Sequence, residues 1–149
     1  MNDHSEGLTQ LKFGQILAKG YAFAVILFSL WGISLRTFGL GFSGADMFSA
    51  SAALMLCSCA LIPTSIVASA LKTGIAHAWL AVFAATTLAL ALYVVAGFQS
   101  TDFNLPYIIN ATGSAVLLVS HVVSAATTPW GSHPAALRAE QVEAQNRAA

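Results

Sequence analysis

The sequence predicts an all-α integral membrane protein, a bundle of four transmembrane helices, from its composition and its hydropathy pattern. Of the 149 residues, 57% are hydrophobic and 8% are charged, whereas a soluble domain carries about 25% charged residues. Four stretches also reach the roughly 20 mostly apolar residues that a helix needs to cross a bilayer. We expect these helices at about 19–36, 47–71, 75–98 and 105–127, and no acidic or basic residue lies in them away from their ends.

Two shorter segments flank this transmembrane domain, which covers 19–128. The first, 1–18, is expected to lie in the cytoplasm or at the membrane surface, with a short interfacial helix over 8–19. A cleavable signal peptide is the competing interpretation, but no small-residue cleavage site follows the first apolar stretch, so we expect a retained helix. The segment 129–149 is rich in Ala, Gln and Glu, and we expect a cytoplasmic tail.

The connections between the spans are short and carry turn residues. The segment 36–46 is rich in glycine and is expected to form a loop, with Asp46 near the start of the second helix, where a carboxylate is favoured. A tight turn is expected at 71–74, and Pro106 is well placed to open the fourth helix. Because short loops hold successive helices side by side and antiparallel, we expect one up-and-down bundle.

The basic residues predict how this bundle is oriented in the membrane. Five of the six fall on one side if the helices alternate in direction: Lys12, Lys19, Lys72, Arg138 and Arg147. Only Arg36 falls on the other side. Since Lys and Arg are enriched in cytoplasmic segments, we expect both termini in the cytoplasm and the protein in the bacterial inner membrane.

Several classes of function leave no sign in the sequence. The net charge is zero and the basic residues are scattered, whereas a nucleic-acid-binding surface needs a basic patch. The chain has no Gly-rich phosphate loop, no HExxH and no GxSxG. Cys57 and Cys59 are two residues apart on an expected helix, a rotation of about 200°, so they point to different faces and are poorly placed to share a metal or a disulfide.

Polar residues share one face of each span, because positions separated alternately by four and three residues lie together on a helix. On the fourth span this series is Asn110, Ser114, Leu117, His121, Ser124 and Thr128. On the second span it is Ser51, Met55, Ser58, Ile62, Ser65 and Ser69, and Ser29 lies on the first. Polar groups in hydrocarbon are costly unless they face other helices. We name as the polar bundle face Asn110, Ser114, His121, Ser124, Ser58 and Ser65.

The remaining faces are apolar, and we expect them to meet lipid or a partner: Phe23, Leu27, Trp79, Phe83, Leu90 and Val116. On the third span, Ala81, Ala85 and Ala89 form a small-residue ridge that would let another helix approach closely. Pro63 should kink the second helix because it cannot donate to the carbonyl of Cys59. Ser58 or Thr64 is then expected to help satisfy the freed backbone groups.

His77 and His121 lie within or at the edge of the spans, and histidine is the side chain whose ordinary pKa is close to neutral pH. His77 is near the start of the third span, and His121 is about six residues before the end of the fourth, roughly 9 Å deep. A neutral His121 bonded to Ser65 or Ser124 is the simplest interpretation. Binding of haem b by both histidines, a metal site and proton movement are alternatives. The unequal depth argues against two axial ligands on one iron.

These observations favour a non-catalytic membrane protein, either an accessory or assembly subunit or another protein-binding factor of a larger membrane complex. Its surroundings would be membrane lipid and protein partners, and we expect the partners at the outer faces around Trp79 and Phe83. No nucleophile or acid/base pair indicates an enzyme.

Two alternatives stay open. The first is a small transporter or channel that acts as a homo-oligomer through Asn110, Ser114 and His121. The second is a haem- or quinone-binding membrane anchor of a redox complex, which would use His77 and His121.

Overall fold

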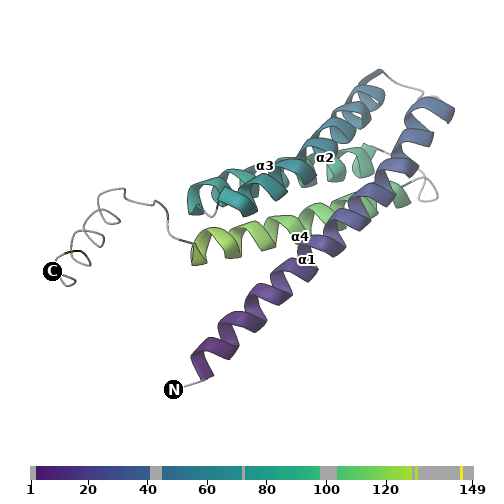
Figure 1. Ribbon diagram of the computed structural model, residues 1–149. Helices are drawn as coiled ribbons and strands as arrows, with labels where there is room; N and C mark the ends of the chain where they lie inside the picture. Colours follow the sequence, from purple (N-terminus) through teal and green to yellow (C-terminus); the bar gives the residue numbers. More distant parts are fainter. Residues whose placement is uncertain are drawn as a thin grey trace.

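The computed structural model describes residues 3–40, 45–71, 73–97, 104–128, 130 and 145. It is almost entirely helical in this part of the chain (Figure 1). The elements are α1 (Asp3–Ser34), the π-helix η1 (Leu35–Leu40), α2 (Ala45–Leu71), α3 (Gly74–Gly97) and α4 (Leu105–Thr127). Four stretches are long and apolar enough to cross a membrane: Phe13–Phe38, Asp46–Leu71, Gly74–Gly97 and Leu105–Thr127. The predicted all-α chain with four span-length helices is confirmed.

Successive helices run in opposite directions, and α4 lies between α1 and α3 (Figure 1). The contact between α3 and α4 is the most extensive, followed by those of α4 with α1 and of α2 with α3. The contact between α1 and α2 is the smallest of the four. Towards its N-terminus α1 departs from the other three helices (Figure 1), which leaves it the most weakly enclosed member of the bundle.

The first helix begins earlier than expected, at Asp3, and helical structure continues beyond its expected end through η1. Residues 8–19, predicted to form a short interfacial helix, are helical but belong to α1, which is continuous from Asp3 to Ser34, since single glycines such as Gly14 are tolerated inside a helix. The loop predicted from residue 36 is wrong in its first part, because η1 continues to Leu40. The rest of that loop, the turn at Lys72, the connection 98–103 and nearly all of the tail 129–149 lie outside the described residues.

Close helix contacts depend on residues without large side chains. A Cβ added at Gly113 of α4 would lie 2.7 Å from Cγ1 of Ile26 and 3.2 Å from the backbone oxygen of Ala22, both on α1. One added at Gly32 of α1 would lie 2.8 Å from Cγ of Pro106. Since these separations are too short for a real side chain, glycine allows α1 and α4 to approach each other as helices do in membranes.

The apolar interior consists of two clusters of buried residues. One contains Ala22, Ile26, Leu61, Ala68, Leu80, Ala84 and Leu117, and the other contains Ile33, Leu54, Ala91, Val94, Tyr107 and Ala111. Four of the residues expected on outer faces pack against these clusters and are partly buried: Phe23, Phe83, Leu90 and Val116. They are partly buried because each lies next to the buried face of its helix, so its side chain still contacts the core. Leu27 and Trp79 are exposed as expected.

Two details of the predicted packing also differ. In the alanine ridge of α3 only Ala81 is buried, while Ala85 is half-buried and Ala89 is exposed. Near Pro63, which lies inside α2, the Thr64 hydroxyl donates to the carbonyl of Ala60 at 2.7 Å. Thr64 therefore bonds its own preceding turn, as threonine does in membrane helices, and not the carbonyl of Cys59.

Candidate functional site in the bundle core

Three buried serines on α2 connect that helix to α4 across the centre of the bundle. Ser51, Ser58 and Ser65 are seven residues apart, so they share one face of the helix. Each hydroxyl is hydrogen-bonded to a side chain of α4, namely Tyr107, Asn110 and His121 in that order. The order shows that α2 and α4 run parallel. We call the three sets of contacts the Tyr107 layer, the Asn110 layer and the histidine layer.

The Tyr107 layer joins the end of the first helix to α2 and α4. The Ser51 and Tyr107 hydroxyl oxygens are 2.6 Å apart, and Thr37 Oγ1 lies 3.3 Å from Ser51 Oγ. Thr37 also donates to the backbone oxygen of Ile33 at 2.8 Å. Tyr107 and Thr37 were not among the residues predicted from the sequence. Tyr107 lies three residues before Asn110 and therefore on its face, and a buried tyrosine hydroxyl needs a partner, so a signal was present.

The Asn110 layer joins α1, α2 and α4. The Asn110 amide nitrogen donates to Ser29 Oγ at 2.9 Å and to Ser58 Oγ at 3.1 Å. Its amide oxygen accepts from Ser58 at 3.3 Å and from Ser114 at 3.5 Å, and Ser29 donates to the backbone oxygen of Ile26. Asn110 therefore uses both its donors and its acceptor within the bundle.

The histidine layer joins all four helices. Ser65 Oγ lies 2.9 Å from Nε2 of His121, whose Nδ1 lies 3.2 Å from Nδ1 of His77. The two imidazole rings are stacked, with their centroids 5.4 Å apart and their planes at 27°. On the neighbouring turn Lys19 Nζ donates to Ser69 Oγ at 3.1 Å, and Ser69 donates to the backbone oxygen of Ser65 at 2.9 Å.

The contact between His77 and His121 corrects the inference of unequal depth. A Cβ added at Gly74, the first residue of α3, would lie 2.8 Å from the backbone oxygen of Thr128 and 3.4 Å from that of Ala125. The start of α3 therefore abuts the end of α4, and two long side chains within two turns of that point can meet. The number of residues from the end of each span does not show how the two ends are offset along the bundle.

The geometry of the pair does not suit haem. Two axial ligands bind one iron from opposite sides of the porphyrin, so the macrocycle must lie between them. The facing nitrogens of His77 and His121 are in direct contact at 3.2 Å, which leaves no room for it. A metal site lacks ligands as well: in the described part of the chain, no three His, Cys, Asp or Glu residues lie together in a way that could hold an ion. Cys57 and Cys59 are free thiols there.

All six residues of the polar bundle face are buried, so their predicted place in the interior is confirmed. Ser69, expected on the same face of α2, is instead exposed at the edge of the bundle. Two buried polar atoms in the described residues have no hydrogen-bond partner, Oδ1 of Asn104 and Oγ of Ser120. The sequence analysis singled out neither.

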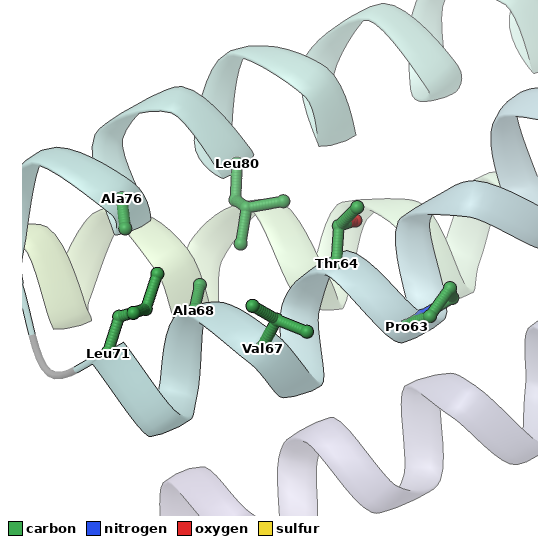
Figure 2. Close-up of a pocket in the computed structure, with 7 residues that line it drawn as sticks. All are labelled: Pro63, Thr64, Val67, Ala68, Leu71, Ala76 and Leu80. Carbon is green, nitrogen blue, oxygen red and sulfur yellow. The ribbon is translucent and has the colours of Figure 1, made fainter.

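A separate hollow lies on the outside of the bundle, where α2 and α3 diverge (Figure 2). It is an open groove of about 330 Å³ lined by Pro63, Thr64, Val67, Ala68, Leu71, Ala76 and Leu80. Its lining is almost entirely apolar, and the hydroxyl of Thr64 is bonded to its own helix. The groove therefore offers no group that would orient a polar substrate.

Comparison of the chain with protein-family models, curated proteins and solved structures finds no match. Its function is therefore argued from its own geometry.

Proposed function

We propose that this protein is a non-catalytic subunit of the inner membrane that binds another integral membrane protein, as an accessory or assembly factor of a larger complex. The observation that carries the proposal is the outer face of α1 and η1. Along it, positions separated alternately by four and three residues are exposed: Leu17, Tyr21, Ala24, Phe28, Trp31, Leu35 and Phe38. We call these seven residues the α1 stripe.

The composition of the α1 stripe supports this assignment more than its spacing does. Every helix of a bundle has an exposed face at this spacing, and on α3 it holds Ile75, Trp79, Val82, Thr86, Ala89 and Tyr93. The α1 stripe has aromatic residues at four of seven positions, and Trp31 and Phe38 are 66% and 70% exposed. Aromatic residues are enriched where proteins bind each other, and a 3.5-residue repeat is the seam of paired helices.

The position of α1 in the bundle gives a partner room to bind. The seven residues of the α1 stripe are exposed, although Phe38 also packs edge to face against Phe48 of α2, with the ring centroids 6.2 Å apart. The interior supports a non-catalytic role as well. Asn110 and His121, the most polar members of the polar bundle face, are bonded to other side chains of the bundle.

Photo-crosslinking in the host membrane tests the proposal. A benzophenone-bearing amino acid replaces Trp31 in one variant and Trp79, which is 71% exposed on α3, in the matched control. We expect adducts with one other membrane polypeptide from position 31. Position 79 tests the face around Trp79 and Phe83 where the sequence predicted the partners. Because Phe83 is partly buried against the core, we now expect lipid adducts alone from that face. If neither position gives a protein adduct, the proposal is wrong. Adducts between two copies of this chain would instead favour self-association, as in the transporter hypothesis.

A further inference from the structure

We propose that His77 and His121 form a single proton-binding site inside the membrane domain, which takes up one proton per chain and not two. The inference rests on the 3.2 Å separation of the two Nδ1 atoms and on the groups around the pair. It goes beyond the proposed function, because it holds whether or not the α1 stripe binds a partner.

In the uncharged pair, one hydrogen must lie between the two Nδ1 atoms. A neutral imidazole has one N–H and one nitrogen lone pair, and 3.2 Å is a hydrogen-bond distance. If His77 donates from Nδ1, then His121 carries its hydrogen on Nε2 and donates it to Ser65. If His121 donates from Nδ1, its Nε2 accepts from the Ser65 hydroxyl. A hydroxyl both donates and accepts, so Ser65 satisfies His121 in either case.

One added proton fits this arrangement without loss of a hydrogen bond. In the first tautomer the proton enters at the lone pair of His77 Nε2. In the second it enters at His121 Nε2, and Ser65 changes from donor to acceptor. Both routes give the same cation. In that cation each ring carries an Nε2–H, and the third hydrogen is shared between the two Nδ1 atoms. The Ser65 oxygen accepts from His121. The shared bond becomes charge-assisted, and such bonds are roughly twice as strong as neutral ones.

A second proton does not fit. Both Nδ1 atoms would then carry a hydrogen and face each other with no acceptor between them. The two imidazolium charges would lie on rings whose centroids are 5.4 Å apart, in an interior that screens charge poorly.

None of the described groups around the pair offsets a second charge. From α1, Lys19 adds positive charge that acts on both rings. From α2, Ser65 and Ser69 are neutral, and Asp46 lies at the opposite end of that helix. Neither α3 nor α4 contains an acidic residue. Double protonation would therefore force the start of α3 away from the end of α4.

Nitrogen-15 NMR of histidine-labelled protein in lipid nanodiscs tests the stoichiometry. The full-length chain is used with His4→Gln and His133→Gln, so that only the pair contributes signals. Between pH 8 and pH 4 we expect the number of ring N–H groups to rise from two to three, with a scalar coupling across the hydrogen bond that joins the two Nδ1 atoms. A count of four at pH 4, a count that stays at two, or the absence of the coupling would overturn the proposal.

A pair of serine variants separates the site from general packing. Ser65→Ala removes the partner of His121 Nε2, so the resonance of that nitrogen should shift while the Nδ1 coupling persists. Ser58→Ala removes the same group one heptad away, where it bonds Asn110, and should leave all histidine signals unchanged. Equal shifts in the two variants would contradict the assignment of Ser65 to the site.

Discussion

The helices α1 and α4 are both long enough to cross a membrane, yet they occupy opposite kinds of position. Half of the residues in the most apolar stretch of α4 are buried, against 22% in that of α1. The buried face of α4 carries Tyr107, Asn110 and His121, which reach all three polar layers. The exposed face of α1 carries large aromatic residues. Thus α4 organises the interior of the bundle, while α1 provides an aromatic part of its outer surface.

The largest effect is expected where α1 and α4 touch. Gly113→Leu would place a side chain where a Cβ alone is 2.7 Å from Ile26, and overpacking of this kind costs about 1–3 kcal/mol. We expect a loss of about 3 kcal/mol of unfolding free energy, measured by reversible unfolding in bicelles. Gly20→Leu, at a position with nothing within 4 Å of the added Cβ, is the control and should be nearly neutral. Because leucine has a higher helix propensity than glycine, propensity favours both variants, and equal losses would mean that the close approach at Gly113 does not explain the effect.

A smaller loss is expected in the centre of the bundle. Asn110→Ala removes the amide oxygen that accepts from Ser58 and Ser114. It also removes the amide nitrogen that donates to Ser29. Because unsatisfied buried groups cost about 1–3 kcal/mol, we expect a loss near 2 kcal/mol in the same measurement. The control Thr112→Ala removes a hydroxyl that is exposed and bonded to its own helix. A neutral Asn110→Ala would show that water or lipid replaces the amide.

Removal of a single hydroxyl should have a lesser effect. Tyr107→Phe keeps the buried ring and deletes the oxygen that lies 2.6 Å from Ser51. Hydrogen bonds between membrane helices are worth about 0.6 kcal/mol on average, and we expect a loss of that size. Tyr93→Phe, at an exposed position on α3, is the matched control. A loss above about 2 kcal/mol would indicate that the Tyr107 layer is cooperative.

The smallest effect on stability is expected on α1. Trp31→Ala removes a side chain that no other part of the described bundle covers, so its unfolding free energy should change by less than about 0.5 kcal/mol. The same variant should lose its partner in pull-down experiments from host membranes. A stability loss comparable to that of Asn110→Ala would show that Trp31 supports the bundle itself.

The sequence predicted much of this architecture because a membrane-spanning helix is recognised by the length of its apolar stretch. The expected 105–127 coincides with α4, and the expected second and third spans agree with α2 and α3 within two residues. The periodicity of polar residues also placed Ser58, Asn110 and His121 inside. Contacts between helices were harder to predict, because they depend on stagger and on close approach at residues such as Gly74 and Gly113. For that reason the sequence placed His77 and His121 at unequal depths, although their side chains are in contact.

The equal spacing of the serines on α2 has a consequence for axial register. Apolar side chains face lipid and other helices with similar ease, so they oppose the sliding of one membrane helix along another only weakly. The three serine contacts do oppose it, because a shift by one turn would break the contacts of Ser51, Ser58 and Ser65 together. At about 0.6 kcal/mol each, they favour the observed register over a slipped one by roughly twentyfold. In this protein polar residues thus fix where along their length α2 and α4 meet, as a buried asparagine does in a coiled coil.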